Sequence, residues 1–267
     1  PGPGHRGGPV SDGPRIAGKR GALFGAKPAH AAPFSAFFDA ALLPAPPASF
    51  GHYANLPELG MLGNDRLSDC VVAMAAHRLM YWNAAAGRRV EFSEENVIRT
   101  YREVSGYNPM IPFSDRGVDM STFPDYWQRT GVLDAAGERH RIDLWVTLEL
   151  GNWDNFVLAC WLFDGCDMGV GLPQDAEAMF SAGHPWWGPS HGDQGDGHGV
   201  AAYGVNSKGS LVIATWGALQ AVDRAWWEKY TVWLDCPVSI DALGAKEISP
   251  EGYDRAALLA YARKLRQ

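Results

Sequence analysis

One stretch constrains the fold of this chain more than any other: the polar loop at residues 63–69, followed at once by apolar residues up to about 86. The loop contains turn-forming Gly, Asn and Asp, and the switch to apolar residues predicts a buried helix that begins at Cys70. Ser68 or Asp69 can cap this helix by accepting a hydrogen bond from a free backbone N–H. With a rise of about 1.5 Å per residue and a glycine as C-terminal cap, the helix is about 25 Å long. It is long enough to cross a domain core.

Cys70 has two interpretations at this point. A thiol in the first turn of a helix lies in the positive field of the helix dipole, which favours the nucleophilic thiolate. Cysteine is also among the most buried residue types, and the neighbouring carboxylate of Asp69 works to raise a thiol pKa. The rest of the chain must decide between a nucleophile and a packing residue.

Composition excludes several classes of protein. The chain has 267 residues, 46% of them hydrophobic, and a net charge of −7, so neither nucleic acid nor a membrane surface is expected as the main partner. Four cysteines are too few for a disulfide framework, and reduced thiols are expected, although Cys160 and Cys166 could pair. We expect no transmembrane helix, because no apolar run approaches about 20 residues, and no signal peptide, because the N-terminus lacks an apolar core.

The composition changes along the chain predict three regions. The first is a Gly/Pro-rich basic arm and lead-in at residues 1–50, which cannot bury enough apolar surface to fold alone. It either wraps its own domain or binds a protein partner, and both readings stay open. A main domain follows at 51–240, with a helical lobe at about 51–135 and a β lobe at about 136–240, and then a tail with a short helix at 241–267.

Periodicity and capping signals predict an α+β fold, with helices first and an antiparallel sheet second. Helices are expected at residues 34–43, 70–86, 93–101, 122–130, 152–163 and 175–182. Strands are expected at residues 142–148, 167–172, 200–205, 211–216 and 230–234. The pairs Trp186-Trp187 and Trp226-Trp227 are expected in the core or an interface rather than as stacking platforms, because the chain shows no basic groove.

From about Leu62 to Leu234 the chain resembles the papain-like cysteine peptidase superfamily. That family places its nucleophilic Cys at the start of a long central helix, where Cys70 stands, and a Gln oxyanion donor six residues earlier, where Asn64 stands. Its catalytic His opens a strand of His-Ala-Val-Ala type, which His198 and the three residues after it resemble, 128 positions after Cys70. The resemblance implies a papain-like α+β fold with Cys70 as nucleophile, His198 as base and Asn64 as oxyanion donor. The Asn-Asp-x3-Asp-Cys form of the loop resembles a divergent group found in bacteriophages and bacteria.

One position departs from the family pattern. The family's Asn-Ser-Trp-Gly stretch is matched at residues 214–217, but Ala214 stands where an Asn orients the catalytic His. Strand alternation is expected to turn Thr215 to the opposite face unless a bulge intervenes. Asp193 or Asp196, in the loop before His198, could take over the orienting role.

Two functions follow from the resemblance. The first is a hydrolase of peptide or amide bonds that uses the Cys70–His198 dyad without a cofactor. The second is a catalytically silent papain-like scaffold, a structural or interaction protein of a phage virion, which contacts partners through the basic arm and can form an oligomer or assembly. The location expected is cytoplasmic or in a virion. No metal is expected, because the His and Asp residues at 191–198 fit neither the calcium-loop pattern nor zinc-ligand spacing.

Overall fold

The structure is a computed structural model of the chain. It describes residues 15–31, 33–36, 43, 45–111, 113–188, 192 and 194–239. The helix expected at 34–43 appears only as the short 3₁₀ turn η1 (Phe34–Ala36), and most of its remainder lies outside the described residues. The helix expected in the tail also lies outside them.

Three helices form the first half of the domain: α1 (Cys70–Ala85), α2 (Glu94–Ser105) and α3 (Phe123–Arg129). The helix expected at Cys70 begins there and is buried along most of its length. Ser93 caps α2 by accepting a hydrogen bond from the N–H of Asn96 at 3.3 Å, and Gly106 ends that helix with a left-handed φ of 75°. The cap expected for α1 is wrong: Asp69 holds the N-cap position, but its side chain accepts no hydrogen bond from the helix. Its carboxyl is packed against Gly63 instead, where an added Cβ would lie 2.7 Å from Oδ2.

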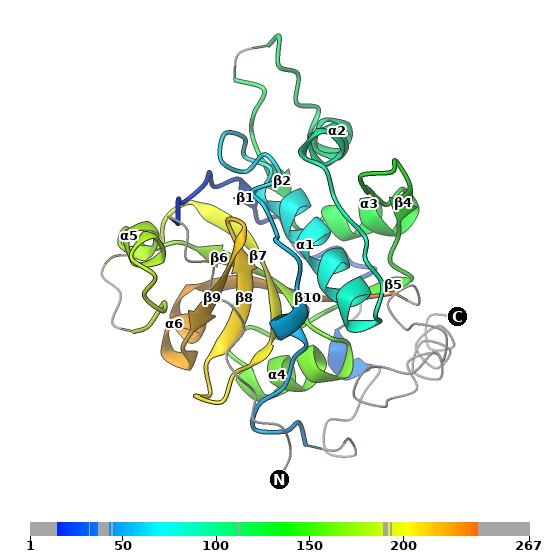
Figure 1. Cartoon of the computed structure of the whole chain (residues 1–267). Helices are drawn as coiled ribbons and strands as arrows, with labels where there is room; N and C mark the ends of the chain where they lie inside the picture. Colours follow the sequence, from blue (N-terminus) through cyan, green and yellow to red (C-terminus); the bar gives the residue numbers. More distant parts are fainter. Residues whose placement is uncertain are drawn as a thin grey trace.

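The second half of the domain is built on an antiparallel sheet (Figure 1). Within the described residues, its six strands lie in the order β5-β10-β6-β7-β8-β9. Their bounds are β5 (Leu144–Thr147), β6 (Cys166–Gly171), β7 (Gly197–Val205), β8 (Leu211–Thr215), β9 (Ala218–Val222) and β10 (Thr231–Val238). Three helices accompany the sheet: α4 (Trp153–Leu162), α5 (Ala176–Ser181) and α6 (Arg224–Tyr230). The α+β class and the papain-like order of helices before sheet are confirmed.

Two small sheets complete the fold of the described residues. One pairs β1 (Ala22–Leu23), from the N-terminal arm, with β2 (Val118–Asp119) in parallel, and the other pairs β3 (Val132–Leu133) with β4 (Arg139–His140). In Figure 1 the dark-blue β1 lies beside β2, at the junction between α1 and the large sheet. The arm therefore reaches the place where the helical half meets the sheet.

Two hydrophobic cores lie on the two faces of the large sheet. Along β7, Ala201 and Tyr203 pack with α1 in one core, whereas Val200 and Ala202 face the other core, which α4 and α6 cover. This second core contains the buried Trp186, Trp226 and Trp227, and the fourth tryptophan of the two pairs, Trp187, is 49% exposed.

A buried ion pair joins α1 to the sheet. The fully buried guanidinium of Arg78 donates from Nε to Asp167 Oδ1 at 3.2 Å and from Nη1 to the carbonyl of Asp164 at 3.1 Å. Asp235 lies opposite Asp167 on the neighbouring strand and accepts a hydrogen bond from Trp233 Nε1 at 2.6 Å. Burial, and next the charge of Asp167, raise the pKa of Asp235 well above its usual range, against the opposing charge of Arg78.

All four cysteines are free and buried. Cys160, Cys166 and Cys236 lie in the sheet core, and Cys70 lies at the start of α1. The described part of the chain has no helix with the length and apolar content needed to cross a membrane. Nor do three His, Cys, Asp or Glu side chains converge as metal ligands anywhere in the described ranges, although His191 and Asp193 lie outside them.

Candidate active site

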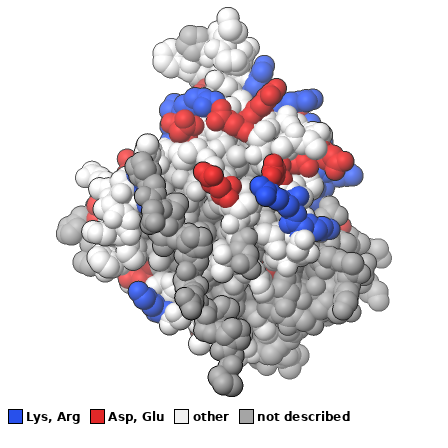
Figure 2. All heavy atoms as spheres, in the orientation of Figure 1, with Lys and Arg blue, Asp and Glu red and all other residues white. Residues whose placement is uncertain are grey.

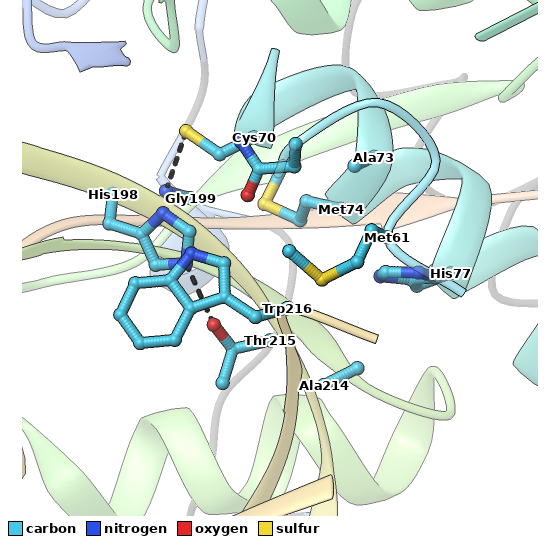
Figure 3. A pocket seen from close by; sticks show the side chains of 11 residues that line it. Met61, Cys70, Ala73, Met74, His77, His198, Gly199, Ala214, Thr215 and Trp216 are labelled. Carbon is cyan, nitrogen blue, oxygen red and sulfur yellow. Dashed lines mark hydrogen bonds between the residues drawn. The ribbon is translucent and has the colours of Figure 1, made fainter. Parts of the chain in front are cut away.

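Asn64, Cys70 and His198, the three residues expected to form the site, line one small pocket. Figure 3 shows Cys70 and His198 in it. Asn64 comes from the loop before α1, Cys70 is the first residue of α1, and His198 is the second residue of β7. Thr215 and Trp216, at the end of β8, line the same pocket. Its volume is about 10 Å³, room for about one water molecule, so the site in this state does not admit a substrate.

The Cys70 thiol is 1% exposed. Its Sγ accepts a hydrogen bond from the backbone N–H of Gly199 at 3.4 Å, which fixes the sulfur beside the residue that follows His198. Burial raises the pKa of Cys70 to about 12, against the opposing effect of the Gly199 N–H, and the charge of Asp69 raises it further. In this state the sulfur is a neutral thiol.

The imidazole of His198 is held from two sides. Its Nε2 lies 2.7 Å from Thr215 Oγ1, and the ring of Trp216 packs over the imidazole with centroids 4.7 Å apart. Nδ1 is buried with no hydrogen-bond partner, so one ring nitrogen is held and the other is free for a proton. Burial, and next the charge of Arg20, lower the pKa of His198 to about 3, and the ring is neutral.

Thr215, rather than residue 214, contacts the His198 ring. The expectation that Thr215 faces away from His198 is therefore wrong. Alternation does separate Thr215 from Ala214, whose side chain packs in the core with α1. His198 shares its face of β7 with Val200 and Ala202, however, and Ala202 pairs with Ile213 on β8. Thr215 shares the face of Ile213, so it is a diagonal cross-strand neighbour of His198 without any bulge at this end of the strand.

Asp196, one of the two residues expected in this role, is exposed and is not a hydrogen-bond partner of His198. Asp193, the other one, lies outside the described residues, and its role stays a prediction. The sequence shows the alternation but not the register of β7 against β8, which shifts between Ala202 and Gly204, and this register decides that His198 and Thr215 share a face.

Asn64 lies at the site, but its amide is already in use. Its Nδ2 donates to the carbonyls of Lys19 and Leu67, each at 3.0 Å, and its backbone carbonyl accepts from the N–H of Lys19 at 2.6 Å. The Lys19 carbonyl therefore occupies one of the two N–H directions that an oxyanion donor would offer.

Residues 15–27, here named the covering segment, pack against the pocket wall: an added Cβ at Gly18 would lie 2.4 Å from the carbonyl oxygen of Asn64 and 2.7 Å from Trp216, two residues that line the pocket. The N–H of Gly21 donates to the carbonyl of Gly197 at 3.0 Å, and the carbonyl of Gly21 accepts from the N–H of Val118 at 2.8 Å. Gly21 has no space for a side chain, because an added Cβ would lie 2.2 Å from the carbonyl oxygen of Ser68. The described part of the basic arm thus packs on its own domain, against residues that line the pocket.

The fold has relatives among solved structures, although no family model matches the chain and no curated protein matches its sequence. Xylellain, a cysteine protease from Xylella fastidiosa, aligns with a TM-score of 0.58 and 13% identity, over 85% of this chain and 98% of that one. Procathepsin B S9 from Trypanosoma congolense aligns with a TM-score of 0.55 and 11% identity, over 82% and 86%. The proform of the ragweed pollen cysteine protease Amb a 11 aligns with a TM-score of 0.53 and 15% identity, over 78% and 70%. The chain therefore has the fold of the papain-like cysteine proteases.

Proposed function

We propose that this protein is a cysteine hydrolase of peptide or amide bonds, held inactive by its own covering segment. The observation that carries the proposal is the arrangement around His198: Nε2 is fixed by Thr215, while the buried Nδ1 has no partner in the pocket that also contains the Cys70 thiol. A structural histidine would be expected to satisfy both ring nitrogens.

The proposed reaction begins when the covering segment leaves the pocket. Water then reaches both groups, so the burial that raises the pKa of Cys70 and lowers that of His198 is relieved, and the proton moves from Sγ to the imidazole. The thiolate attacks the carbonyl carbon, and His198 returns the proton to the nitrogen as the C–N bond breaks. Water, deprotonated by His198, then hydrolyses the thioester and frees Cys70.

Asn64 is the proposed oxyanion donor, together with the backbone N–H of Cys70. Its amide releases the Lys19 carbonyl when the covering segment leaves, so that one N–H becomes free for the substrate. A donor of this kind contributes about 2.7–4 kcal/mol in well-studied hydrolases.

A test uses the full-length protein with Gly21→Val, which forces the covering segment off Ser68. Iodoacetamide is added, and modification of each cysteine is followed by mass spectrometry alongside cleavage of a mixed peptide library. We expect Cys70 to react faster than in the unmodified protein, to lose this reactivity with His198→Ala, and to be required for cleavage. Ile16→Ala is the matched control, since Ile16 belongs to the same segment but is 68% exposed.

The alternative, a catalytically silent scaffold in a phage virion, has one observation in its favour: both site groups are neutral and sealed in the closed state. It predicts that Cys70 in the Gly21→Val protein reacts no faster than Cys236 and that no peptide is cleaved. That result, with circular dichroism showing an intact fold, would refute the hydrolase.

A further inference from the structure

The covering segment carries two adjacent cations, and each meets a carboxylate on a different side of the pocket. Lys19 Nζ lies 3.4 Å from Asp115 Oδ2 on the helical side. Arg20 donates from Nε to Glu177 Oε1 at 3.0 Å, and its Nη2 lies 2.8 Å from the same oxygen, on α5 beside the sheet. The backbone between them is the part of the segment that passes Asn64 and Gly197.

Asp115 is held in place independently of Lys19. Its Oδ1 accepts hydrogen bonds from the hydroxyl of Tyr101 at 2.6 Å and from the backbone N–H of Ser68 at 2.9 Å. Burial works to raise its pKa, but the hydrogen bonds from Tyr101 and Ser68 and the charge of Lys19 outweigh this and lower the pKa below its usual range. Asp115 therefore stays ionised and fixed beside the nucleophile loop.

Glu177 is in the first turn of α5 and its side chain is 45% exposed, so it too is available once Arg20 leaves. The net charge of the domain also favours a basic peptide. Residues 1–32 contain five basic residues and one Asp, a net charge of +4. Since the whole chain has a net charge of −7, residues 33–267 have a net charge of −11. On the face shown in Figure 2, acidic and basic side chains alternate, with no continuous basic patch among the described residues.

We propose that Asp115 and Glu177 select the substrate, and that the pocket binds peptides with two adjacent basic side chains. In the closed state Lys19 and Arg20 of the covering segment take the place of these two side chains. The inference rests on the proposed hydrolase and adds its substrate class. A neutral peptide would leave the two carboxylates without a cation, whereas a dibasic peptide replaces both ion pairs of the covering segment. Each exposed pair contributes up to about 1 kcal/mol, or about five-fold in affinity.

The test measures binding separately from chemistry. The protein is the full chain with Gly21→Val and Cys70→Ser, and the probes are fluorescent octapeptides with Lys-Arg, Arg-Lys or Leu-Gln at the centre, read by anisotropy. We expect the better dibasic peptide to bind about ten-fold more tightly than the Leu-Gln peptide, and Asp115→Asn or Glu177→Gln each to reduce that preference about three- to five-fold. Asn at 115 keeps an oxygen to accept from Ser68 and Tyr101.

The matched controls are Glu91→Gln in the helical half and Glu228→Gln in the sheet half, exposed carboxylates that pair with neighbouring arginines. They should leave the preference unchanged. Equal binding of all peptides, or a dibasic preference that the two controls reduce as much as Asp115→Asn and Glu177→Gln do, would overturn the inference.

The two proposals fail in different ways. With Cys70 restored, cleavage of Leu-Gln peptides as fast as dibasic ones would refute the selectivity and leave the hydrolase standing. Charge-selective binding without cleavage of any peptide would refute the hydrolase and leave the selective pocket standing.

Discussion

Replacing Thr215 with Val is the most direct test of how His198 is held. Valine has nearly the same shape as threonine but removes the hydroxyl that lies 2.7 Å from His198 Nε2, in a place where both residues are at most 2% exposed. In the closed state His198 is neutral, so the lost hydrogen bond should reduce the free energy of unfolding by about 1 kcal/mol. In the open state the bond supports an imidazolium, and such charge-assisted bonds contribute about 1.5–3 kcal/mol.

The difference between the two figures sets the expected effect on reactivity. A differential loss of about 0.5–2 kcal/mol lowers the pKa of His198 in the open state by about 0.4–1.5 units and the thiolate–imidazolium population by about 2- to 30-fold. The assay is the rate of Cys70 alkylation from pH 5 to 9 in the Gly21→Val protein, with Thr215→Ser as the matched control that keeps the hydroxyl. If Thr215→Val and Thr215→Ser give the same pH profile, Thr215 does not orient the base.

Three further predictions concern buried polar groups. Arg78→Met leaves Asp167 as a buried charge without its cation, so urea denaturation should show a loss of about 3–5 kcal/mol, and a loss below about 1 kcal/mol would contradict the ion-pair account. Asp235 has a raised pKa when folded, so the native state keeps a proton that the unfolded chain releases above about pH 4, and stability should fall as pH rises toward that raised pKa. Asp235→Asn should lose this fall, and parallel pH–stability curves for the two proteins would argue against it. Ala214→Asn should cost about 1–3 kcal/mol without speeding Cys70 alkylation, because Ala214 faces the α1 core; a faster reaction would mean that residue 214 reaches His198.

The fold was predictable where local signals and tertiary packing agree. The apolar run after residue 69 placed the start of α1 at Cys70, and Ser93 with the two acids after it placed α2. The hairpin from β8 to β9 was missed because its turn, Trp216-Gly217, has positive φ at a tryptophan and lacks the usual Asn-Gly signature.

The candidate site was predictable in its members but not in its state. The resemblance to the papain-like family brought Asn64, Cys70 and His198 together, through their order and spacing along the chain. The covering segment was not predictable, since its Gly-rich backbone has no intrinsic preference and is placed by partners far away in the chain, such as Gly197 and Val118. Its glycines were the available hint, because Gly21 fits where a side chain would collide with Ser68.

The positions of the four cysteines allow thiol labelling to report separately on local opening and on global unfolding of the protein. Cys70 lies at the start of α1 beside the covering segment, whose Gly21 N–H acts on its sulfur, whereas Cys160, Cys166 and Cys236 lie in the core of the sheet. Labelling of Cys70 in native conditions therefore measures the free energy of a local opening, and labelling of the other three measures the free energy of global unfolding. One mass-spectrometric time course then yields both free energies from the same molecules. A substitution that loosens the covering segment is thereby distinguished from one that destabilises the whole domain.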